Sequence, residues 1–338
     1  MNLETGTFVP AVPVPLDAEL QVVYDDFLVE EPELKRMNLE LLAEIRAEVD
    51  AAVAKLGDLS YGGRFTVSQP SAPGLAGAAE IPLLICTPAG APASRPVLYF
   101  MHGGGFFCND HRLGLDQLLD AAERFGATLI SVGYRLAPEH PYPAQINDAY
   151  AGLLWAADHA DELGINPDRI VVAGYSAGGG LSAALALTVR DKGGPRLLGQ
   201  LLMAPMLDDR NDSVSAMQMD GVEFWNRSHN LFGWGALLRD VHGGPDVPQY
   251  AAPARATDLT GLPPAFLDVG SAECLRDEVV DYASRIWQAG GKAELHVWPG
   301  GIHAFDREAP EARISQAAVA ARHNWLERLL ASDQPAQD

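Results

Sequence analysis

Cysteines and basic residues are scarce in this chain of 338 residues, and both shortages narrow its possible functions. The three cysteines, Cys86, Cys108 and Cys274, match neither a zinc-binding nor a redox spacing. An odd and sparse set of cysteines favours a reducing compartment over a disulfide-stabilised secreted fold. Lysine and arginine total 24 against 45 aspartates and glutamates, a formal net charge of −21. Such an acidic surface disfavours nucleic acids and anionic membranes as partners.

Long apolar runs and a basic leader are also missing. No window reaches the roughly 18 apolar residues that a spanning helix needs. The first 20 residues have neither a basic start nor an apolar stretch, so we expect no signal peptide. No carboxylate cluster of the calcium-loop type occurs, so we expect no metal site. These features indicate a cytoplasmic, globular protein that does not enter the membrane, and its 48% of hydrophobic residues are enough for a large core.

Short apolar runs alternate with amphipathic segments over most of the chain. Strands are predicted over 64–68, 81–87, 96–101, 128–132, 169–173, 198–203, 265–269 and 293–298, and helices over 115–125, 144–163, 177–191, 277–289 and 315–330. This alternation predicts βα units and a sheet that is mostly parallel and covered on both faces. Helical segments at 17–29 and 33–56, before the sheet, and at 207–244, within it, interrupt the rhythm.

The sharpest local signal is the pentapeptide Gly174-Tyr175-Ser176-Ala177-Gly178. It follows an apolar strand and opens a helix, which is the context that a nucleophile elbow requires. The serine hydroxyl then projects above the sheet at a helix N-terminus, where developing negative charge is favoured. A glycine-rich turn without chemistry is the alternative, but the strand–turn–helix context favours Ser176 as a nucleophile.

A second signal, His102-Gly103-Gly104-Gly105, ends the strand predicted over 96–101. Glycines let backbone N–H groups point into a site without obstruction by side chains, and a tetrahedral intermediate needs such donors. The N–H of Ala177 would add a donor, because it follows the nucleophile. A phosphate-binding loop is excluded, since neither Gly-Lys-Ser/Thr nor a G-x-G-x-x-G that opens a helix is present. His102 is expected to support this loop rather than to act as a base.

The general base is predicted to be His303, in the loop after the strand at 293–298. The chain order nucleophile, acid, histidine is typical of this kind of site. The acid should come from the loop that follows the strand at 265–269. Glu273 is favoured over its rival Asp277, because Asp277 is expected to lie already in the next helix. Histidines with weaker positions in the pattern are His102, His140, His229, His242 and His296.

Taken together, the motifs resemble those of hormone-sensitive-lipase-like esterases, the bacterial family IV carboxylesterases. The motifs are HGGGF at 102–106, GYRLAPEHPYPA at 133–144, GYSAGG at 174–179, ECLRDE at 273–278 and PGGIHAF at 299–305. They occur in the family order, and the resemblance covers about residues 60–330. It implies an α/β-hydrolase fold with an eight-stranded, mostly parallel sheet flanked by helices. It also implies a helical cap formed by segments 1–60 and 207–245 over a core of 61–206 and 246–338, and oxyanion donors at Gly104, Gly105 and Ala177.

Two positions depart from the usual family pattern. The elbow has Tyr175 where aspartate or threonine is usual, and the acid motif begins with Glu273 rather than aspartate. The sequence PMLDDR at 205–210 and this glutamate look like the branch whose elbow reads GTSAG, which supports Glu273 as the acid. Arg135 and Asp148 are interpreted as a structural ion pair.

The resemblance implies a serine carboxylic-ester hydrolase that acts on short- to medium-chain acyl esters through an acyl-enzyme and needs no cofactor. The substrate pocket is expected between the oxyanion loop and the cap. Its candidate lining residues, for which plain packing is an equal alternative, are Phe106, Phe107, Tyr175, Trp225, Phe232 and Trp234. Alternatives left open are an amide, carbamate or lactone hydrolase with the same triad, and a non-catalytic ligand receptor.

Two further expectations concern the surface and the oxyanion loop. The family makes a homodimer through the last strand, 293–298, plausible, since an edge strand is a natural pairing site. Cys108 lies close to the oxyanion loop, so it is expected to make the enzyme sensitive to thiol reagents.

Overall fold

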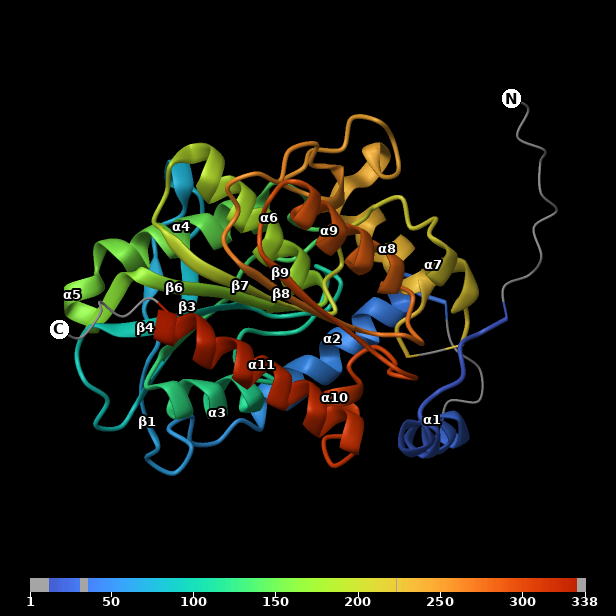
Figure 1. The fold of residues 1–338 in the computed structure, drawn as a ribbon, viewed down its shortest axis with the longest axis horizontal. Coiled ribbons are helices and arrows are strands. Elements are labelled where there is room, and N and C mark those ends of the chain that lie inside the picture. The colour runs from blue at the N-terminus through green and yellow to red at the C-terminus, as the bar shows by residue number, and fades with distance from the viewer. Residues whose placement is uncertain (1–11, 31–35, 223, 333–338) are drawn as a thin grey trace.

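A computed structural model describes residues 12–30, 36–222 and 224–332, and a twisted sheet runs through its centre (Figure 1). Nine strands make up the sheet: β1 (Phe65–Ser68), β2 (Ser71–Ala72), β3 (Ile81–Pro88), β4 (Arg95–Met101), β5 (Thr128–Val132), β6 (Ile165–Tyr175), β7 (Leu197–Met203), β8 (Ala265–Gly270) and β9 (Ala293–Trp298). Their order is β1-β3-β5-β4-β6-β7-β8-β9, and β2 pairs with β3. The expected eight strands form this path, and the ninth is the two-residue β2.

Along the part β5-β4-β6-β7-β8-β9 of this order, neighbouring strands are parallel. Strand β3 is antiparallel to both of its neighbours on the path, β1 and β5. Helices cover both faces of the sheet. One face carries α4 (Ala144–Asp158), α6 (Ala177–Lys192) and α9 (Arg276–Gln288), and the other carries α3 (Asp116–Phe125) and α11 (Arg313–Ser332) (Figure 1). Because both faces are covered, β5, β7 and β8 consist entirely of buried residues, which explains their unbroken apolar runs.

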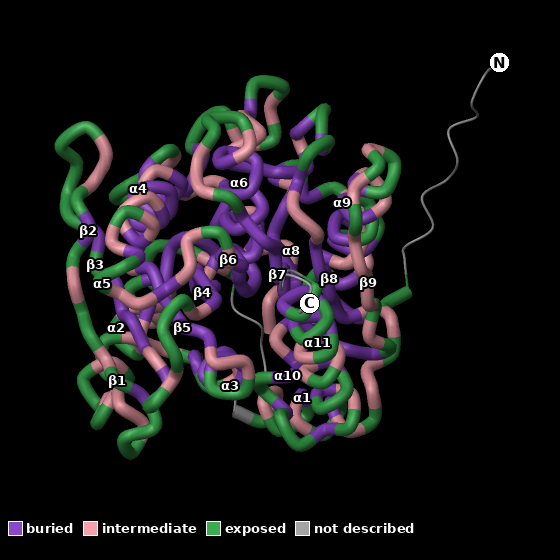
Figure 2. Tube along the Cα trace, turned by 60° about the vertical axis from the view of Figure 1, so that its left-hand side comes forward, coloured by how far each residue is buried: buried purple, intermediate pink, exposed green. Residues whose placement is uncertain are grey.

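The strand at one edge of the sheet, β9, is less buried than its neighbour β8 (Figure 2). Every residue of β8 is buried, whereas every residue of β9 is only partly buried or exposed. The described strand β9 pairs with β8 on one side and lies at the end of the strand order. This edge therefore presents backbone groups that another chain can pair with.

Two predicted helices differ from those in the structure. The helix predicted over 144–163 is interrupted at His159, which ends α4 and precedes the short α5 (Ala160–Leu163). Gly164 then adopts a left-handed conformation (φ 61°) and ends α5, as glycine commonly does after a helix. The helix predicted over 33–56 appears as α2 (Leu39–Ala54), and residues 33–35 of that prediction lie outside the described residues. A short helix that the pattern missed, α10 (Phe305–Glu308), follows the loop that carries His303.

Two distant parts of the chain contribute helices that lie beside the sheet (Figure 1). They are α1 (Ala18–Glu30) and α2 from the N-terminal part, and α7 (Val214–Gln218) and α8 (Arg227–Leu238) from the segment after β7. The Phe224 ring contacts Tyr24 and Phe27 edge-on at centroid distances of 5.5 and 4.6 Å. Arg46 of α2 donates a hydrogen bond to the carbonyl oxygen of Phe107 at 2.8 Å. These four helices are called the helical layer below, and α2 reaches the loop that follows β4.

Candidate active site

The elbow joins β6 to α6 through a strained turn. Ser176 has φ 55° and ψ −121°, a conformation that is rare for residues other than glycine and is found where a site fixes its geometry. The two flanking glycines are required by close backbone contacts. A Cβ atom on Gly174 would lie 2.0 Å from the carbonyl oxygen of Gly178, and one on Gly178 would lie 2.0 Å from that of Met101. The turn thus holds the Ser176 side chain at the N-terminus of α6.

A chain of hydrogen bonds joins Ser176, His303 and Glu273. The Oγ of Ser176 lies 3.0 Å from Nε2 of His303, and Nδ1 of His303 lies 3.1 Å from Oε1 of Glu273. The other carboxylate oxygen of Glu273 accepts the N–H of Gly270 at 3.0 Å. Because the carboxylate can only accept, the proton of the neutral imidazole sits on Nδ1, and Nε2 is left to accept from the serine hydroxyl. All three side chains are buried.

The rival acid, Asp277, is occupied elsewhere. One of its carboxylate oxygens accepts the backbone N–H of Ser215 at 2.7 Å, and the other accepts Nε of Arg276 at 2.8 Å. Neither bond involves His303. Of the two carboxylates that the sequence left in competition, the structure brings Glu273 to the histidine.

The loop after β4 passes close to the elbow, since a Cβ atom on Gly103 would lie 3.3 Å from Cβ of Ser176. The carbonyl oxygen of Gly104 accepts the N–H groups of Phe107 and Cys108, each at 3.0 Å. The N–H of Gly105 belongs to the same peptide plane, so it points in the opposite direction. Gly104 and Gly105 have φ values of 107° and 59°, which favour glycine. Within the described residues, no acceptor is hydrogen-bonded to the N–H of Gly104, Gly105 or Ala177, so these donors remain available.

His102 lies beneath this loop as a neutral support. Its ring is buried and stacks on Tyr134 with a centroid distance of 4.3 Å. Its Nδ1 lies 2.7 Å from the carbonyl oxygen of Gly103, while the Tyr134 hydroxyl donates to the carbonyl oxygen of His102 at 2.7 Å. Burial lowers the pKa of His102 to about 4, so the imidazole is uncharged at neutral pH. The expected supporting role agrees with these contacts.

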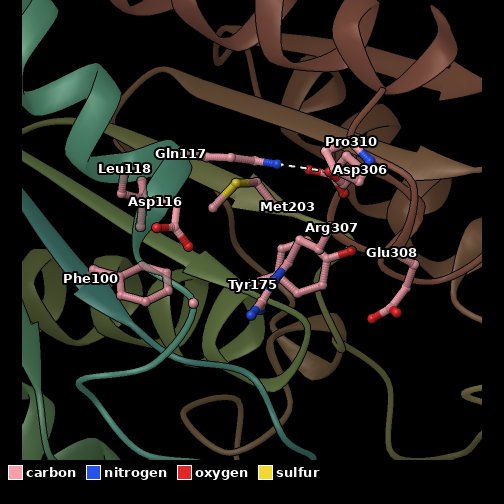
Figure 3. A pocket seen from close by; sticks show the side chains of 11 residues that line it. Phe100, Asp116, Gln117, Leu118, Tyr175, Met203, Asp306, Arg307, Glu308 and Pro310 are labelled. Atoms are coloured by element: carbon pink, nitrogen blue, oxygen red, sulfur yellow. Dashed lines mark hydrogen bonds between the residues drawn. The ribbon is translucent and has the colours of Figure 1, made fainter. Parts of the chain in front are cut away.

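Tyr175 lies close to both His303 and the loop after β4, since a Cβ atom on Gly103 would lie 3.6 Å from Cδ1 of its ring. We expected it in the substrate pocket, but its buried ring meets His303 edge-on at 5.6 Å, and the Arg307 guanidinium lies over its face at 5.7 Å. Burial raises the pKa of Tyr175 well above its usual value. The ring also forms part of the wall of a cavity of about 410 Å³, whose lining does not include Ser176 (Figure 3). That cavity is lined by Phe100, Gly114, Asp116, Gln117, Leu118, Tyr175, Met203, Asp306, Arg307, Glu308 and Pro310.

The other predicted lining residues divide into two groups. Trp225 lies beside the site: its ring is 5.8 Å from that of His303, and a Cβ atom on Gly105 would lie 2.5 Å from the indole. Phe107 stacks on Trp225 at 5.8 Å and meets Phe232 edge-on at 5.1 Å. By contrast, the Phe106 ring packs against the fully buried Trp234 at 5.5 Å, as residues of the core do.

Cys108 corrects our expectation of thiol sensitivity. Its side chain is buried, and its Sγ donates to the carbonyl oxygen of Gly104 at 3.3 Å. Burial raises the pKa of the thiol to about 12. Since the thiolate is the reactive form, Cys108 is protected despite its place beside the loop.

A buried ion network behind the triad was not predicted. Arg322 of α11 donates to Asp268 of β8 at 2.8 Å and to Asp306, which follows the histidine loop. Burial raises the pKa of Asp268. For Asp306 burial acts in the same direction, but the charge of Arg322 and the hydrogen bonds to the carboxylate together outweigh it and lower the pKa. The network ties the strand before Glu273 to the loop of His303. No sequence signal pairs these residues, because 54 positions separate Asp268 from Arg322.

Two other features bear on partners and ligands. In the ranges that the structure covers, no helix has the length and apolar character needed to cross a membrane. The same ranges contain no group of three or more histidine, cysteine, aspartate or glutamate side chains placed to hold a metal ion. The expected ion pair between Arg135 and Asp148 is present, with an N–O distance of 2.8 Å.

Comparisons with known proteins place the chain in a family. A family model described as the alpha/beta hydrolase fold matches residues 97–307. The carboxylesterase NlhH of Mycobacterium tuberculosis is 37% identical over 244 residues, which cover 69% of this chain and 73% of the relative. Two solved structures agree over nearly the whole chain. A bacterial heroin esterase matches with 37% identity, a TM-score of 0.85 and coverage of 93% of this chain and 98% of that one. The esterase LipW from Mycobacterium marinum matches with 31% identity, a TM-score of 0.82 and coverage of 95% and 98%.

The chain therefore belongs to the α/β-hydrolase family. Within that family its relatives are hormone-sensitive-lipase-like esterases, and the chain is a carboxylesterase, a serine carboxylic-ester hydrolase.

Proposed function

We propose that the enzyme hydrolyses short- to medium-chain acyl esters through an acyl-enzyme on Ser176. The observation that carries this proposal is the hydrogen-bond chain from Ser176 through His303 to Glu273. Ser176 Oγ attacks the ester carbonyl carbon while Nε2 of His303 takes the hydroxyl proton. Glu273 stabilises the imidazolium that results.

The remaining steps return the proton and release both products. The carbonyl oxygen becomes an oxyanion that accepts the N–H groups of Gly104, Gly105 and Ala177, which have no other acceptor among the described residues. His303 then gives its proton to the alcohol oxygen as the C–O bond breaks, and the alcohol leaves. A water molecule, deprotonated by His303, attacks the acyl-enzyme, and the carboxylic acid leaves Ser176 in its original state.

The restriction to short and medium chains is proposed from the helical layer, which we interpret as the cap. The Phe107 ring lies directly beside Gly105, and α2 contacts the same loop through Arg46. A large aromatic side chain this close to the proposed oxyanion donors leaves limited depth for an acyl chain.

A homodimer through β9 is proposed from the open sheet edge. Trp287 of α9 and Val297 of β9 expose 48% and 38% of their surfaces, so apolar side chains accompany the unpaired backbone. Size-exclusion chromatography with light scattering tests this proposal: a mass of twice 36.2 kDa supports it, and a monomer at micromolar concentration opposes it. A cytoplasmic location is proposed because all three cysteines are free thiols.

The proposed activity is tested with p-nitrophenyl esters of two to twelve acyl carbons, using the wild type and Ser176→Ala. We expect turnover that is highest at the short end of the series and that is lost in the variant. A folded wild type that hydrolyses no member contradicts the proposal and directs attention to amides, carbamates or lactones. A wild type that prefers twelve carbons contradicts the proposed chain length alone.

A further inference from the structure

A second imidazole lies close to the proposed catalytic histidine. His229 belongs to the first turn of α8, and its ring lies 5.2 Å from that of Trp225 at an interplanar angle of 32°. The same indole lies 5.8 Å from the ring of His303 at 34°. The indole of Trp225 therefore contacts two imidazoles, those of His229 and His303, and it also touches the oxyanion loop at Gly105. The mechanism above gives His229 no role.

The hydrogen bonds of His229 leave one donor unused. Its Nδ1 accepts the backbone N–H of Asn226 at 3.4 Å, as part of the capping box that begins α8. Burial lowers the pKa of His229 to about 4, and the neighbouring His303 acts in the same direction. The ring is thus neutral, and its single proton sits on Nε2. Among the described residues, no acceptor is hydrogen-bonded to this Nε2.

The indole between the two histidines is held firmly. Its Nε1 donates to Oδ1 of Asn230 at 2.5 Å, and its backbone carbonyl accepts the Cys274 thiol at 3.4 Å. Asn230 is fully buried and also donates to Asn211 at 3.3 Å. Cys274 directly follows Glu273, so these bonds fix the wall made by Trp225 and His229 relative to the proposed acid.

The position of this wall identifies the part of the substrate that it faces. His303 must reach the oxygen of the departing alcohol to protonate it, so the alcohol lies next to His303. Trp225 contacts His303, and its indole, on which Phe107 stacks, supplies aromatic surface beside the alcohol, which suits a planar group. Beyond the indole, His229 offers a hydrogen-bond donor that a purely hydrocarbon alcohol leaves unused.

We propose that His229 sets the specificity for the alcohol half of the ester by donating its Nε2–H to an acceptor oxygen on a flat alcohol that stacks on Trp225. The substrate class is therefore aryl or similarly planar esters whose alcohol carries a carbonyl or ether oxygen. This inference rests on the proposed ester hydrolysis at Ser176. A site that is built to hydrogen-bond a substrate group discriminates against the analogue that lacks it.

The test compares matched alcohols in matched variants. The substrates are 3- and 4-acetylphenyl butyrate, which carry the acceptor, and 3- and 4-ethylphenyl butyrate, which do not. The enzymes are the wild type, His229→Phe, and His323→Phe as a control, since His323 contacts Phe125 on the opposite face of the sheet. The intrinsic reactivity of each ester is the same for every enzyme. It therefore cancels when the kcat/KM of each variant is divided by the kcat/KM of the wild type for the same ester.

We expect His229→Phe to lower kcat/KM about tenfold for at least one acetylphenyl ester, the size of one hydrogen bond, and by less than about twofold for both ethylphenyl esters. His229→Gln retains a donor and should keep part of the preference, and His229→Leu replaces the phenylalanine variant if that variant does not fold. Equal losses on both kinds of ester, or no loss on either, overturn the inference. A wild type that hydrolyses none of the four esters instead contradicts the proposed function on which the inference rests.

Discussion

Replacing Glu273 by glutamine should disable the enzyme through the histidine tautomer, with little change in shape. Oε2 of Glu273 accepts the N–H of Gly270 at 3.0 Å, so the amide oxygen of the glutamine must take that position. The amide NH₂ then faces Nδ1 of His303, where Oε1 now lies at 3.1 Å. A donor at this place forces Nδ1 to accept, and the proton moves to Nε2. His303 can then no longer take the proton of Ser176.

The expected loss in kcat is about 10⁴-fold, which corresponds to about 5.4 kcal/mol of transition-state stabilisation. The assay is steady-state hydrolysis of p-nitrophenyl butyrate, with thermal unfolding to confirm that the variant folds. Asp277→Asn is the matched control: its bonds go to Ser215 and Arg276, so its kcat should stay within about tenfold of the wild type. A folded Glu273→Gln variant with nearly normal kcat, or a comparable loss in Asp277→Asn, would refute this reasoning.

Three further predictions concern stability and reactivity. Arg322→Met leaves Asp268 and Asp306 buried without their cation, and should lower the free energy of unfolding by about 3–5 kcal/mol in urea titrations; a loss below about 1 kcal/mol contradicts the network. His102 has a folded pKa of about 4, below the unfolded value, so the unfolded chain binds more protons and stability should fall as the pH drops from about 6.5 toward 4, by up to about 1.4 kcal/mol per pH unit. The variant His102→Asn should make the free energy of unfolding depend less on pH in this range. An unchanged pH dependence would mean that other groups cause it. Cys108, with its thiol pKa near 12, should stay unmodified by iodoacetamide at pH 7.5 in the folded enzyme, and rapid alkylation seen by mass spectrometry would oppose this.

The parts of the site that could be predicted are those encoded in short stretches. Ser176 stands out because a strand, a glycine-flanked turn and a helix follow one another within a few residues. His303 and Glu273 follow from chain order, because parallel strands bring the loops after β8 and β9 to the same end of the sheet. The covered sheet is equally visible in sequence, since the unbroken apolar run of β5 has no polar face.

What was missed depends on contacts between distant segments. The break at His159 does not appear in the apolar periodicity, which continues through the residue. The position of Tyr175 is set by a guanidinium 132 positions further along the chain, Arg307, and by the ring of His303. His229 was one of several histidines with weaker positions in the sequence pattern, because its contact with Trp225 and its capping bond to Asn226 form only in the folded chain.

The central claim, that Ser176 is the nucleophile activated by His303, is tested most directly by covalent labelling. The wild type, Ser176→Ala and His303→Ala are each treated with an excess of a fluorophosphonate, and the adduct is located by peptide mass spectrometry. We predict one adduct per chain on Ser176 in the wild type, none in Ser176→Ala, and greatly slowed labelling in His303→Ala. An adduct on another residue, or an esterase-active wild type that stays unlabelled at Ser176, would contradict the account.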